Sequence, residues 1–393
     1  MDSSSRRRFL ATGLALPAAA SASRSAQSQQ AESPAARPVD SPVFHYRTLG
    51  KTDLKVTTVG FGCMITSDQS VVERGADLGI TYFDTARSYQ QGNNERMVGA
   101  ALKGKRNRVV LSTKSHSATR ADALNDLDTS LKELGTDHVD IWYLHGKSRP
   151  EDITDDLIDA QQTAKKAGKI RFAGVSTHSG QATLIPYLAK DEKIDVILSA
   201  YNFTMEPAVT AAIEGAAKAG KGVVAMKIMA GGAGGRGRGR GGAGPFAEKL
   251  RQPGAMASVL RWVTRNANVA TTVPSMTDMD QLDENIKAGS QPFSPEDAGL
   301  LALRREVLRP FYCNMCGQCA GTCRLGLPVE DMLRCLTYAE GYGQFALGRE
   351  RFLETTAGRA AAACADCPGC TVACPHGVKV AERLIRAQEL FAC

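Results

Sequence analysis

The 393-residue chain lacks any long hydrophobic run. A helix that crosses a membrane needs about 20 consecutive apolar residues, and no segment approaches that length, so we expect no transmembrane span. The chain also lacks a strong excess of one charge, because its net charge is only +7. It therefore gives no sign of a nucleic-acid-binding surface. With 43% hydrophobic residues, the chain can bury the core of one large domain or two.

Cysteine is scarce outside one part of the chain. Eight of the eleven cysteines form two runs near the C-terminus, each spaced C-x2-C-x2-C-x3-C. They are Cys313, Cys316, Cys319 and Cys323, followed by Cys364, Cys367, Cys370 and Cys374. The spacing is typical of bacterial ferredoxins, in which the fourth cysteine of each run binds the other run's cluster. It predicts two 4Fe–4S clusters and a role in electron transfer.

Two other uses of these cysteines are less consistent with the spacing. Zinc also binds paired C-x2-C motifs, but it has no need of a third cysteine at the same step. A disulfide framework is more typical of small secreted domains. Proline follows the second run at Pro375, whereas Arg324 follows the first, so the first run is the less regular one. Amphipathic patterns at 328–342 and 378–392 predict that residues 306–393 form a small, mostly helical ferredoxin-like domain.

The first 22 residues have the pattern of an export signal. Arg6, Arg7 and Arg8 precede a weakly apolar stretch and then small residues, which resembles a twin-arginine signal peptide. That route carries folded cargo, and clusters have to be inserted before export. We expect residues 1–22 to be the signal, residues 23–43 a solvated linker, and the protein to reach the periplasm or the outer face of the cytoplasmic membrane. A disordered basic tail is the alternative.

Eight short β-branched runs alternate with amphipathic segments through the middle of the chain. The runs begin near Val56, Ile80, Val109, Val139, Ile170, Val196, Val223 and Ala270. A strand, a helix and two turns need about 25–30 residues, so this spacing predicts an α/β fold, a (β/α)8 TIM barrel over residues 44–305. A doubly wound sheet is the alternative, but it needs a glycine-rich phosphate turn after its first strand. The segment 60–63 is too weak a match for such a turn.

Polar residues stand where several of these runs end. Asp84, Lys114 and His145 each end a run, and Tyr89 follows Asp84 by five residues. The C-terminal ends of barrel strands converge on one face, so we expect the four side chains to meet there. A nearby ammonium group should lower the pKa of a phenol from its usual value of about 10. The set predicts protonation of a carbonyl oxygen while hydride reaches its carbon.

Residues 46–290 resemble the aldo-keto reductase family. The matching segments are the hairpin-like opening 46–56, Phe83-Asp84-Thr85-Ala86 with Tyr89, Ser112-Thr113-Lys114, and Leu144-His145. The resemblance implies an NAD(P)-dependent oxidoreductase that acts on a small carbonyl or alcohol. It implies Tyr89 as general acid and base, Lys114 and Asp84 as the pair that tunes it, and His145 as the group that orients the carbonyl. With its export signal and cysteine-rich tail, the whole chain resembles the iron–sulfur-bearing branch of the family.

The resemblance also implies where a nicotinamide coenzyme would bind. The implied residues are Ser176 and Thr177 at the carboxamide, Met226 and Lys227 beside the nicotinamide ring, and Ser275, Gln281, Glu284 and Asn285 on the adenine side. Ser275 and Gln281 stand where many members have basic residues for the 2′-phosphate of NADPH, and two aspartates lie nearby. A phosphate would be poorly held there, which favours NAD(H) over NADP(H).

The two halves handle electrons differently. Hydride transfer moves two electrons, whereas a 4Fe–4S cluster passes one, and the sequence offers no flavin site that would divide the pair. We expect the clusters to connect the barrel to an external one-electron redox partner. Two alternatives stay open: clusters that are purely structural beside ordinary carbonyl reduction, or a barrel that is a binding or regulatory subunit with structural or electron-relaying clusters. His116 and His178 are further candidates for substrate contact, and Cys63 for a reactive thiol.

Overall fold

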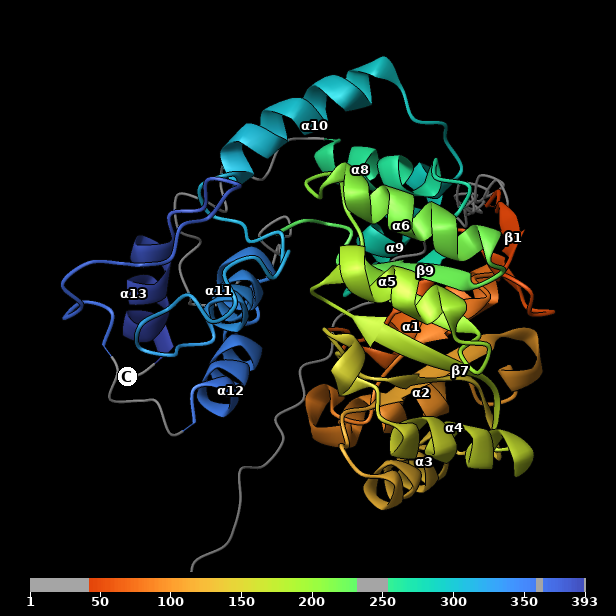
Figure 1. Ribbon diagram of the computed structural model, residues 1–393. Coiled ribbons are helices and arrows are strands. Elements are labelled where there is room, and N and C mark those ends of the chain that lie inside the picture. Colours follow the sequence, from red (N-terminus) through yellow and green to blue (C-terminus); the bar gives the residue numbers. More distant parts are fainter. Residues whose placement is uncertain (1–41, 232–253, 358–362, 392–393) are drawn as a thin grey trace, which may run out of the picture. The chain divides into compact units, whose positions relative to one another are not determined.

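The structure is a computed structural model that describes residues 42–231, 254–357 and 363–391. The predicted signal at 1–22 and nearly all of the predicted linker at 23–43 lie outside this part of the chain. Residues from Pro42 onward form one compact unit (Figure 1).

Eight parallel strands form a single sheet in the order of the sequence. They are β3 (Phe61–Gly62), β4 (Tyr82–Asp84), β5 (Val110–Ser115), β6 (Val139–Leu144), β7 (Ile170–Thr177), β8 (Val196–Ala200), β9 (Gly222–Met226) and β10 (Thr271–Thr272). Parallel bridges from Val59 to Thr272 and from Gly62 to Ser275 join the first strand to the last. The sheet therefore closes into a barrel, which confirms the predicted (β/α)8 architecture.

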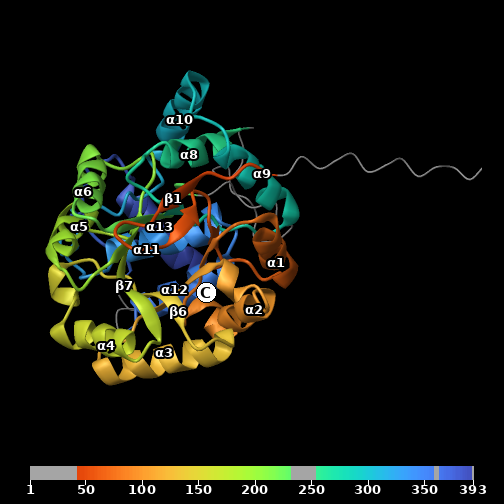
Figure 2. The same ribbon diagram turned by 90° about the vertical axis from the view of Figure 1, so that its right-hand side faces the viewer.

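Helices surround the barrel (Figure 2). They are α1 (Gln69–Leu78), α2 (Asn93–Ala101), α3 (Arg120–Leu134), α4 (Asp155–Lys166), α5 (Gln181–Lys190), α6 (Pro207–Lys218), α8 (Ala255–Thr264) and α9 (Met279–Gly289), with short 3-10 turns η1 (Tyr89–Gly92), η2 (Arg106–Arg108) and η3 (Pro150–Asp152). Helix α3 shows how sequence sets these bounds. Thr119 caps its first turn by accepting a hydrogen bond from the Asp122 amide, and Gly135 ends it in the left-handed conformation.

The run near Val56 is a strand, but it is not the first of the eight barrel strands as predicted; it belongs to the hairpin that the resemblance implies over 46–56. Val56 lies in β2 (Lys55–Thr57), which pairs antiparallel with β1 (Tyr46–Thr48). The side chains of Leu49, Leu54 and Val56 pack with residues of the barrel interior. The hairpin therefore needs apolar residues, and its sequence looks like that of a buried barrel strand. The first barrel strand is Phe61–Gly62, and a Cβ on Gly62 would lie 2.4 Å from the Val273 carbonyl oxygen. Close contact with the last strand requires glycine, so this strand has no β-branched run.

Helix α10 (Pro295–Leu308) runs across the predicted boundary at residue 305. It packs against α8, where the buried Asp297 carboxylate accepts hydrogen bonds from Arg261 and Ser258. Ser294 and Asp297 form a capping box at its start. This helix is therefore fastened to the barrel before the cysteine-rich segment begins.

The cysteine-rich segment is mostly helical, as predicted. Its elements are α11 (Val329–Leu336), the π-helical turn η4 (Thr337–Gly341), α12 (Phe345–Thr355) and α13 (Val380–Phe391). Their apolar side chains form a core of their own, with several of the run cysteines at its edge and Cys335 inside it. A second apolar cluster joins this segment to the barrel through Phe203, Leu308 and Tyr312. In the described part of the chain, no helix combines the length and apolar character that crossing a membrane requires.

Candidate active site

The four predicted catalytic side chains meet at the C-terminal mouth of the barrel. Lys114, at the end of β5, lies with its Nζ 2.6 Å from Asp84 Oδ2 and 3.4 Å from the Tyr89 hydroxyl. Asp84 ends β4, and Tyr89 begins the short turn that follows it. The ring of His145, which follows β6, has its centre 5.9 Å from that of Tyr89. Neighbouring strands thus bring together Asp84 and His145, which are 61 positions apart in the sequence.

Hydrogen bonds from beneath fix the aspartate and the lysine. Ser112 Oγ donates to Asp84 Oδ1 at 2.7 Å, and Tyr82 donates to the Ser112 hydroxyl at 3.2 Å. Lys114 Nζ also donates to the Thr85 carbonyl oxygen at 2.7 Å. These groups are buried in the barrel interior, so the orientation of both charged side chains is set by the scaffold.

The pKa of Tyr89 differs from the prediction made from the sequence. Burial, with Asp84 and Tyr338 adding to it, raises the pKa of the phenol well above its usual value, whereas a lowered pKa was expected from the neighbouring ammonium. Burial also lowers the pKa of Lys114, although Asp84 opposes this. Desolvation disfavours the charged forms of both groups, so the resting site keeps the proton on Tyr89.

Three histidines gather beside this group. His116 and His145 stack with ring centres 3.7 Å apart, and the centre of the His178 ring lies 6.3 Å from that of His145. Burial lowers the pKa of His145 well below its usual value, with His116 and Lys114 contributing. The buried Nδ1 atom of His145 has no hydrogen-bond partner among the described residues. A neutral imidazole with a free ring nitrogen can donate to, or accept from, a ligand oxygen.

The turn that presents Tyr89 has an unusual backbone. Gln90 and Gln91 have φ values of 49° and 55°, in the left-handed region that non-glycine residues rarely adopt. The Gln90 side chain holds the turn by donating to the carbonyl oxygens of Met64 and Thr66. Such conformations persist where surrounding contacts enforce them, often at functional sites.

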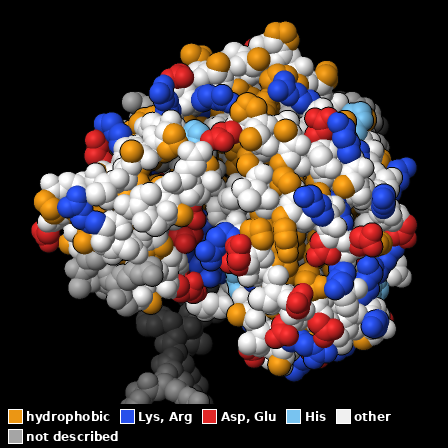
Figure 3. Space-filling view, in the orientation of Figure 1, with side chains coloured by type: hydrophobic (Ala, Val, Ile, Leu, Met, Phe, Trp, Pro, Cys, Tyr) orange, Lys and Arg blue, Asp and Glu red, His pale blue; other side chains and the backbone are white. Residues whose placement is uncertain are grey.

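The cysteine-rich segment contributes side chains to the same mouth, which the sequence did not predict. Lys227, directly after β9, lies with its Nζ 4.8 Å from the centre of the Tyr338 ring and 5.6 Å from that of Tyr342. Tyr338 acts electrostatically on Tyr89, and Arg351 of α12 acts on Tyr89, His116 and His145. Charged side chains of both signs are visible where the C-terminal helices meet the barrel (Figure 3). The only sequence signal for Tyr338 was its place in the amphipathic pattern at 328–342.

The residues implied for coenzyme binding lie in two places. At the strand ends, Ser176 and Thr177 are fully buried, Thr177 pairs in register with Ser199 of β8, and Met226 lies in the apolar interior cluster. On α9, the Gln281 amide is occupied by Thr277 and Asp278. Ser275, which precedes α9, is half-buried, and on the helix Glu284 is exposed and Asn285 is buried.

Burial raises the pKa of Cys313, Cys316, Cys319 and Cys364, and neighbouring thiols add to the effect; these neighbours divide the eight cysteines of the runs into two groups. One group is Cys313, Cys316, Cys319 and Cys374. The other group is Cys323, Cys364, Cys367 and Cys370. Each group takes three thiols from one run and the fourth from the other run. Apart from Cys370, which is exposed, these cysteines are half-buried, and no disulfide joins those that the structure describes.

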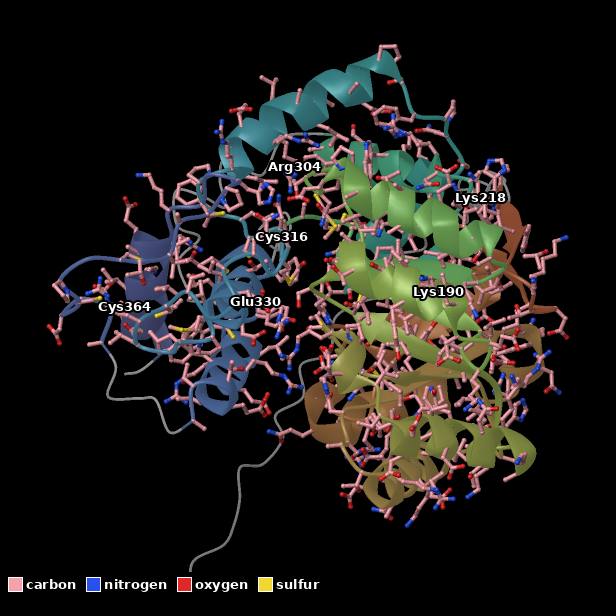
Figure 4. The ribbon with its side chains drawn as sticks, viewed as in Figure 1. Lys190, Lys218, Arg304, Cys316, Glu330 and Cys364 are labelled. Atoms are coloured by element: carbon pink, nitrogen blue, oxygen red, sulfur yellow. The ribbon has the colours of Figure 1, made fainter. Side chains whose placement is uncertain are left out.

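The first of these groups lies next to the barrel. The atoms offered by Cys316, His376 and Glu206 lie within 4.8 Å of one another, and Glu206 precedes α6 of the barrel. Figure 4 shows Cys316 toward the barrel and Cys364 farther from it. Tyr312, directly before Cys313, accepts a 3.2 Å hydrogen bond from Asn202, whose amide also donates to the Lys227 carbonyl oxygen.

Cys63 is not the reactive thiol that its place near the mouth suggested. It is fully buried, and burial raises the pKa of its thiol far above the usual range, with Asp84 contributing. A thiol that resists ionisation is a poor nucleophile.

Comparison with known proteins accounts for the barrel. Residues 66–253 match the Aldo/keto reductase family. Over this segment the chain is similar to aldo/keto reductases. It is 30% identical over 178 residues to the uncharacterized oxidoreductase YqkF of Bacillus subtilis, a match that covers 41% of this chain and 58% of that one. It is 34% identical over 145 residues to the NADP(+) aldo-keto reductase yakc of Schizosaccharomyces pombe, covering 31% of this chain and 42% of that one.

A solved structure extends the likeness over the whole domain. The aldo-keto reductase AKR11C1 from Bacillus halodurans, in its holo form, is 28% identical, with a TM-score of 0.55 over 66% of this chain and 96% of that chain. The chain spans about half the length of the first curated relatives it matches, 58%, 48% and 42%. Their names are those of oxidoreductases.

Proposed function

We propose that the protein is an oxidoreductase of the aldo-keto reductase type, which transfers hydride between a nicotinamide coenzyme and a small carbonyl or alcohol substrate. The observation that carries the proposal is the contact of Lys114 with both Asp84 and Tyr89, at 2.6 Å and 3.4 Å, beside the His145 ring. A phenol, an ammonium, a carboxylate and a neutral imidazole around one point suit proton transfer to a carbonyl oxygen.

The side chains at the strand ends fit a nicotinamide coenzyme. Ser176 at the end of β7 pairs in register with Leu198, and Met226 lies with Leu198 in the apolar interior cluster, so a hydroxyl group and apolar surface are both present at this end of the barrel. Hydroxyls suit an amide, and an apolar side chain suits a flat ring. When bound, the coenzyme supplies or accepts the hydride. Asp278 and Asp280 at the start of α9 favour NAD(H), because they would repel a 2′-phosphate.

The residues of the chain handle the proton. Tyr89, protonated because its pKa is raised, donates from its hydroxyl to the carbonyl oxygen. Lys114, held by Asp84, stabilises the phenolate that remains, and it can return a proton when the site resets. Neutral His145 orients the same oxygen through its ring nitrogen.

The cysteine groups fit two 4Fe–4S clusters. Each group supplies four thiols, and the exchange of the fourth cysteine between the runs is the arrangement of two-cluster ferredoxins. Cys313, Cys316, Cys319 and Cys374 would hold one cluster, and Cys323, Cys364, Cys367 and Cys370 the other. When bound, such clusters supply one-electron transfer. The group near Glu206 would face the barrel, and the other group would face an external redox partner.

Export belongs to the same proposal. The signal-like segment lies outside the described residues, so the proposal rests on Arg6, Arg7 and Arg8 and the sequence that follows them. A periplasmic protein, or one on the outer face of the cytoplasmic membrane, has no free pool of coenzyme, so the coenzyme would enter before export. Replacing Arg6, Arg7 and Arg8 with lysine should leave the protein in the cytoplasm. Fractionation that still places this variant outside would refute the route.

Two measurements on the purified, metal-loaded protein test the proposal. NADH oxidation with a small aldehyde should be lost in Tyr89→Phe by a factor of about 100 or more, while Tyr187→Phe, an exposed tyrosine on α5, should keep it. Metal analysis should find iron and inorganic sulfide. Equal rates in the two variants would refute the catalytic assignment, and zinc in place of iron would refute the clusters.

A further inference from the structure

Lys227 is a cation at the mouth that lacks an acidic partner. It adopts a left-handed backbone with φ of 55° directly after β9, and its Nζ lies 3.5 Å from the Met64 sulfur. The rings of Tyr338 and Tyr342 cover it, and it shares a hydrogen bond with Tyr338. Among the described residues, no carboxylate comes within ion-pair distance of its ammonium. A half-buried ammonium of this kind is stabilised by an anion.

Two carboxylates near the mouth already pair with other cations. Asp84 pairs with Lys114, and Asp331 pairs with Arg334 at 2.5 Å. Neither of these carboxylates therefore pairs with Lys227. Burial acts to raise the pKa of Tyr338, but the positive charges of Lys227 and Arg334 lower it, and the pKa lies below its usual value. The positive field of these two side chains thus outweighs desolvation at a buried phenol.

We propose that Lys227, Arg334 and Tyr338 form a subsite for a negatively charged group of the substrate, so that the substrates are carbonyl compounds bearing a carboxylate. Met64 links the subsite to the proton-transfer group: its sulfur lies 3.5 Å from Lys227 Nζ, and its carbonyl oxygen accepts a hydrogen bond from Gln90, the residue after Tyr89. One small molecule can place its carbonyl at Tyr89 and its carboxylate at Lys227. The ammonium and the guanidinium give charge-assisted hydrogen bonds to such a group, and the phenol adds a donor.

The cysteine-rich segment completes this subsite. Arg334 lies on α11 and Tyr338 on the π-helical turn η4, and π-turns are frequent at functional sites. The turn fits tightly on the barrel, because a Cβ on Gly341 would lie 2.0 Å from the Gly231 carbonyl oxygen. Lys227, Arg334 and Tyr342 keep part of their surface exposed, so a small anion can reach them.

This inference rests on the proposed function in one respect: it takes the anion to be part of the substrate that is reduced. The pyrophosphate of the coenzyme is the other source of negative charge. The two sources can be distinguished. If the subsite takes the substrate, a carboxylate probe binds together with NAD(H). If the subsite takes the coenzyme pyrophosphate, NAD(H) displaces the carboxylate probe.

Calorimetry on the full, metal-loaded chain tests the subsite without turnover. The probes are 4-carboxybenzyl alcohol and its methyl ester, each titrated with and without saturating NAD(H). We expect the acid to bind about tenfold more tightly than the ester, which corresponds to about 1.4 kcal/mol. Lys227→Gln should remove this preference, Tyr338→Phe should reduce it, and Tyr342→Phe, which keeps the covering ring, should retain it.

Two results would overturn the subsite. One is equal binding of acid and ester to the unchanged protein, or a preference that survives Lys227→Gln. The other is loss of acid binding when NAD(H) is added, which would assign the positive charge to the coenzyme. Aldehyde turnover, measured separately with the neutral ester of 4-carboxybenzaldehyde, reports on the proposed function alone. A protein that binds the acid but does not reduce this aldehyde would keep the subsite and lose the reductase assignment.

Discussion

The ammonium of Lys114 lies 2.6 Å from the carboxylate of Asp84, and both side chains are buried at the mouth of the barrel. Each charge is held in place by the other, since burial alone disfavours both. The pair therefore matters for the folded state and for the tyrosine beside it.

Replacing Asp84 with asparagine should leave Lys114 as an unpaired buried charge. We expect a loss of about 3–5 kcal/mol in the free energy of unfolding, together with the loss of aldehyde reduction. Chemical denaturation and steady-state kinetics measure the two effects. Asp137→Asn removes an acid whose side chain is 93% exposed, and it should change neither. Unchanged stability in Asp84→Asn would show that the pair is not held as described.

The grouping of the thiols predicts crossed ligation. Cys374→Ser should disturb the same cluster as Cys316→Ser, and Cys323→Ser the same cluster as Cys367→Ser, because the fourth thiol of each run lies with the other run. Electron paramagnetic resonance of the reduced variants distinguishes the two clusters. Cys335→Ala, a core cysteine outside the runs, should leave both signals. If Cys323→Ser and Cys316→Ser instead affect one signal together, each run ligates its own cluster.

The histidines at the mouth predict a loss of stability in mild acid. Burial lowers the pKa of His116 to about 4, with Arg351 and Lys147 contributing, whereas a histidine of an unfolded chain has a pKa of about 6.5. Between these values the unfolded chain binds a proton that the folded protein does not, so stability falls as the pH falls. Urea unfolding at several pH values gives the free energy of unfolding as a function of pH. This free energy should fall less steeply with falling pH in His116→Asn than in the unchanged protein. An identical slope would mean that His116 takes up its proton in the folded state.

The contact of Gly341 with Gly231 predicts that even a methyl group separates the π-helical turn from the barrel. Gly341→Ala should lower the melting temperature and expose the turn to limited proteolysis, because the obstacle is backbone and cannot move aside. Gly369→Ala, in the same segment, meets no atom within 4 Å and serves as the control. Equal melting temperatures for the two variants would contradict the tight fit of the turn.

Sequence reasoning found the barrel and its four central side chains because both follow from local patterns. The run at Val139–Leu144 is β-branched and apolar, and the residue after it, His145, must then stand at the mouth. The first barrel strand was not predicted because its segment contains Gly60 and Gly62, which allow close contact with the backbone of the last strand. Glycine lacks the β-branched side chain by which the other strands were identified.

The environment of the site could not be read from the sequence. The pKa of Tyr89 depends on burial as well as on charge, and the balance emerges only when the surrounding atoms are placed. Tyr338 and Arg334 reach the mouth through the packing of one segment against another. They lie more than 100 positions from Lys227, and no periodicity links them to it.

Single-turnover reduction of a small aldehyde by the purified, metal-loaded protein with deuterated NADH tests the central claim most directly. The account predicts that deuterium appears on the carbonyl carbon of the product, at a rate that collapses in Tyr89→Phe and in Lys114→Met. Product without deuterium, or deuterium transfer at an unchanged rate in both variants, would contradict it.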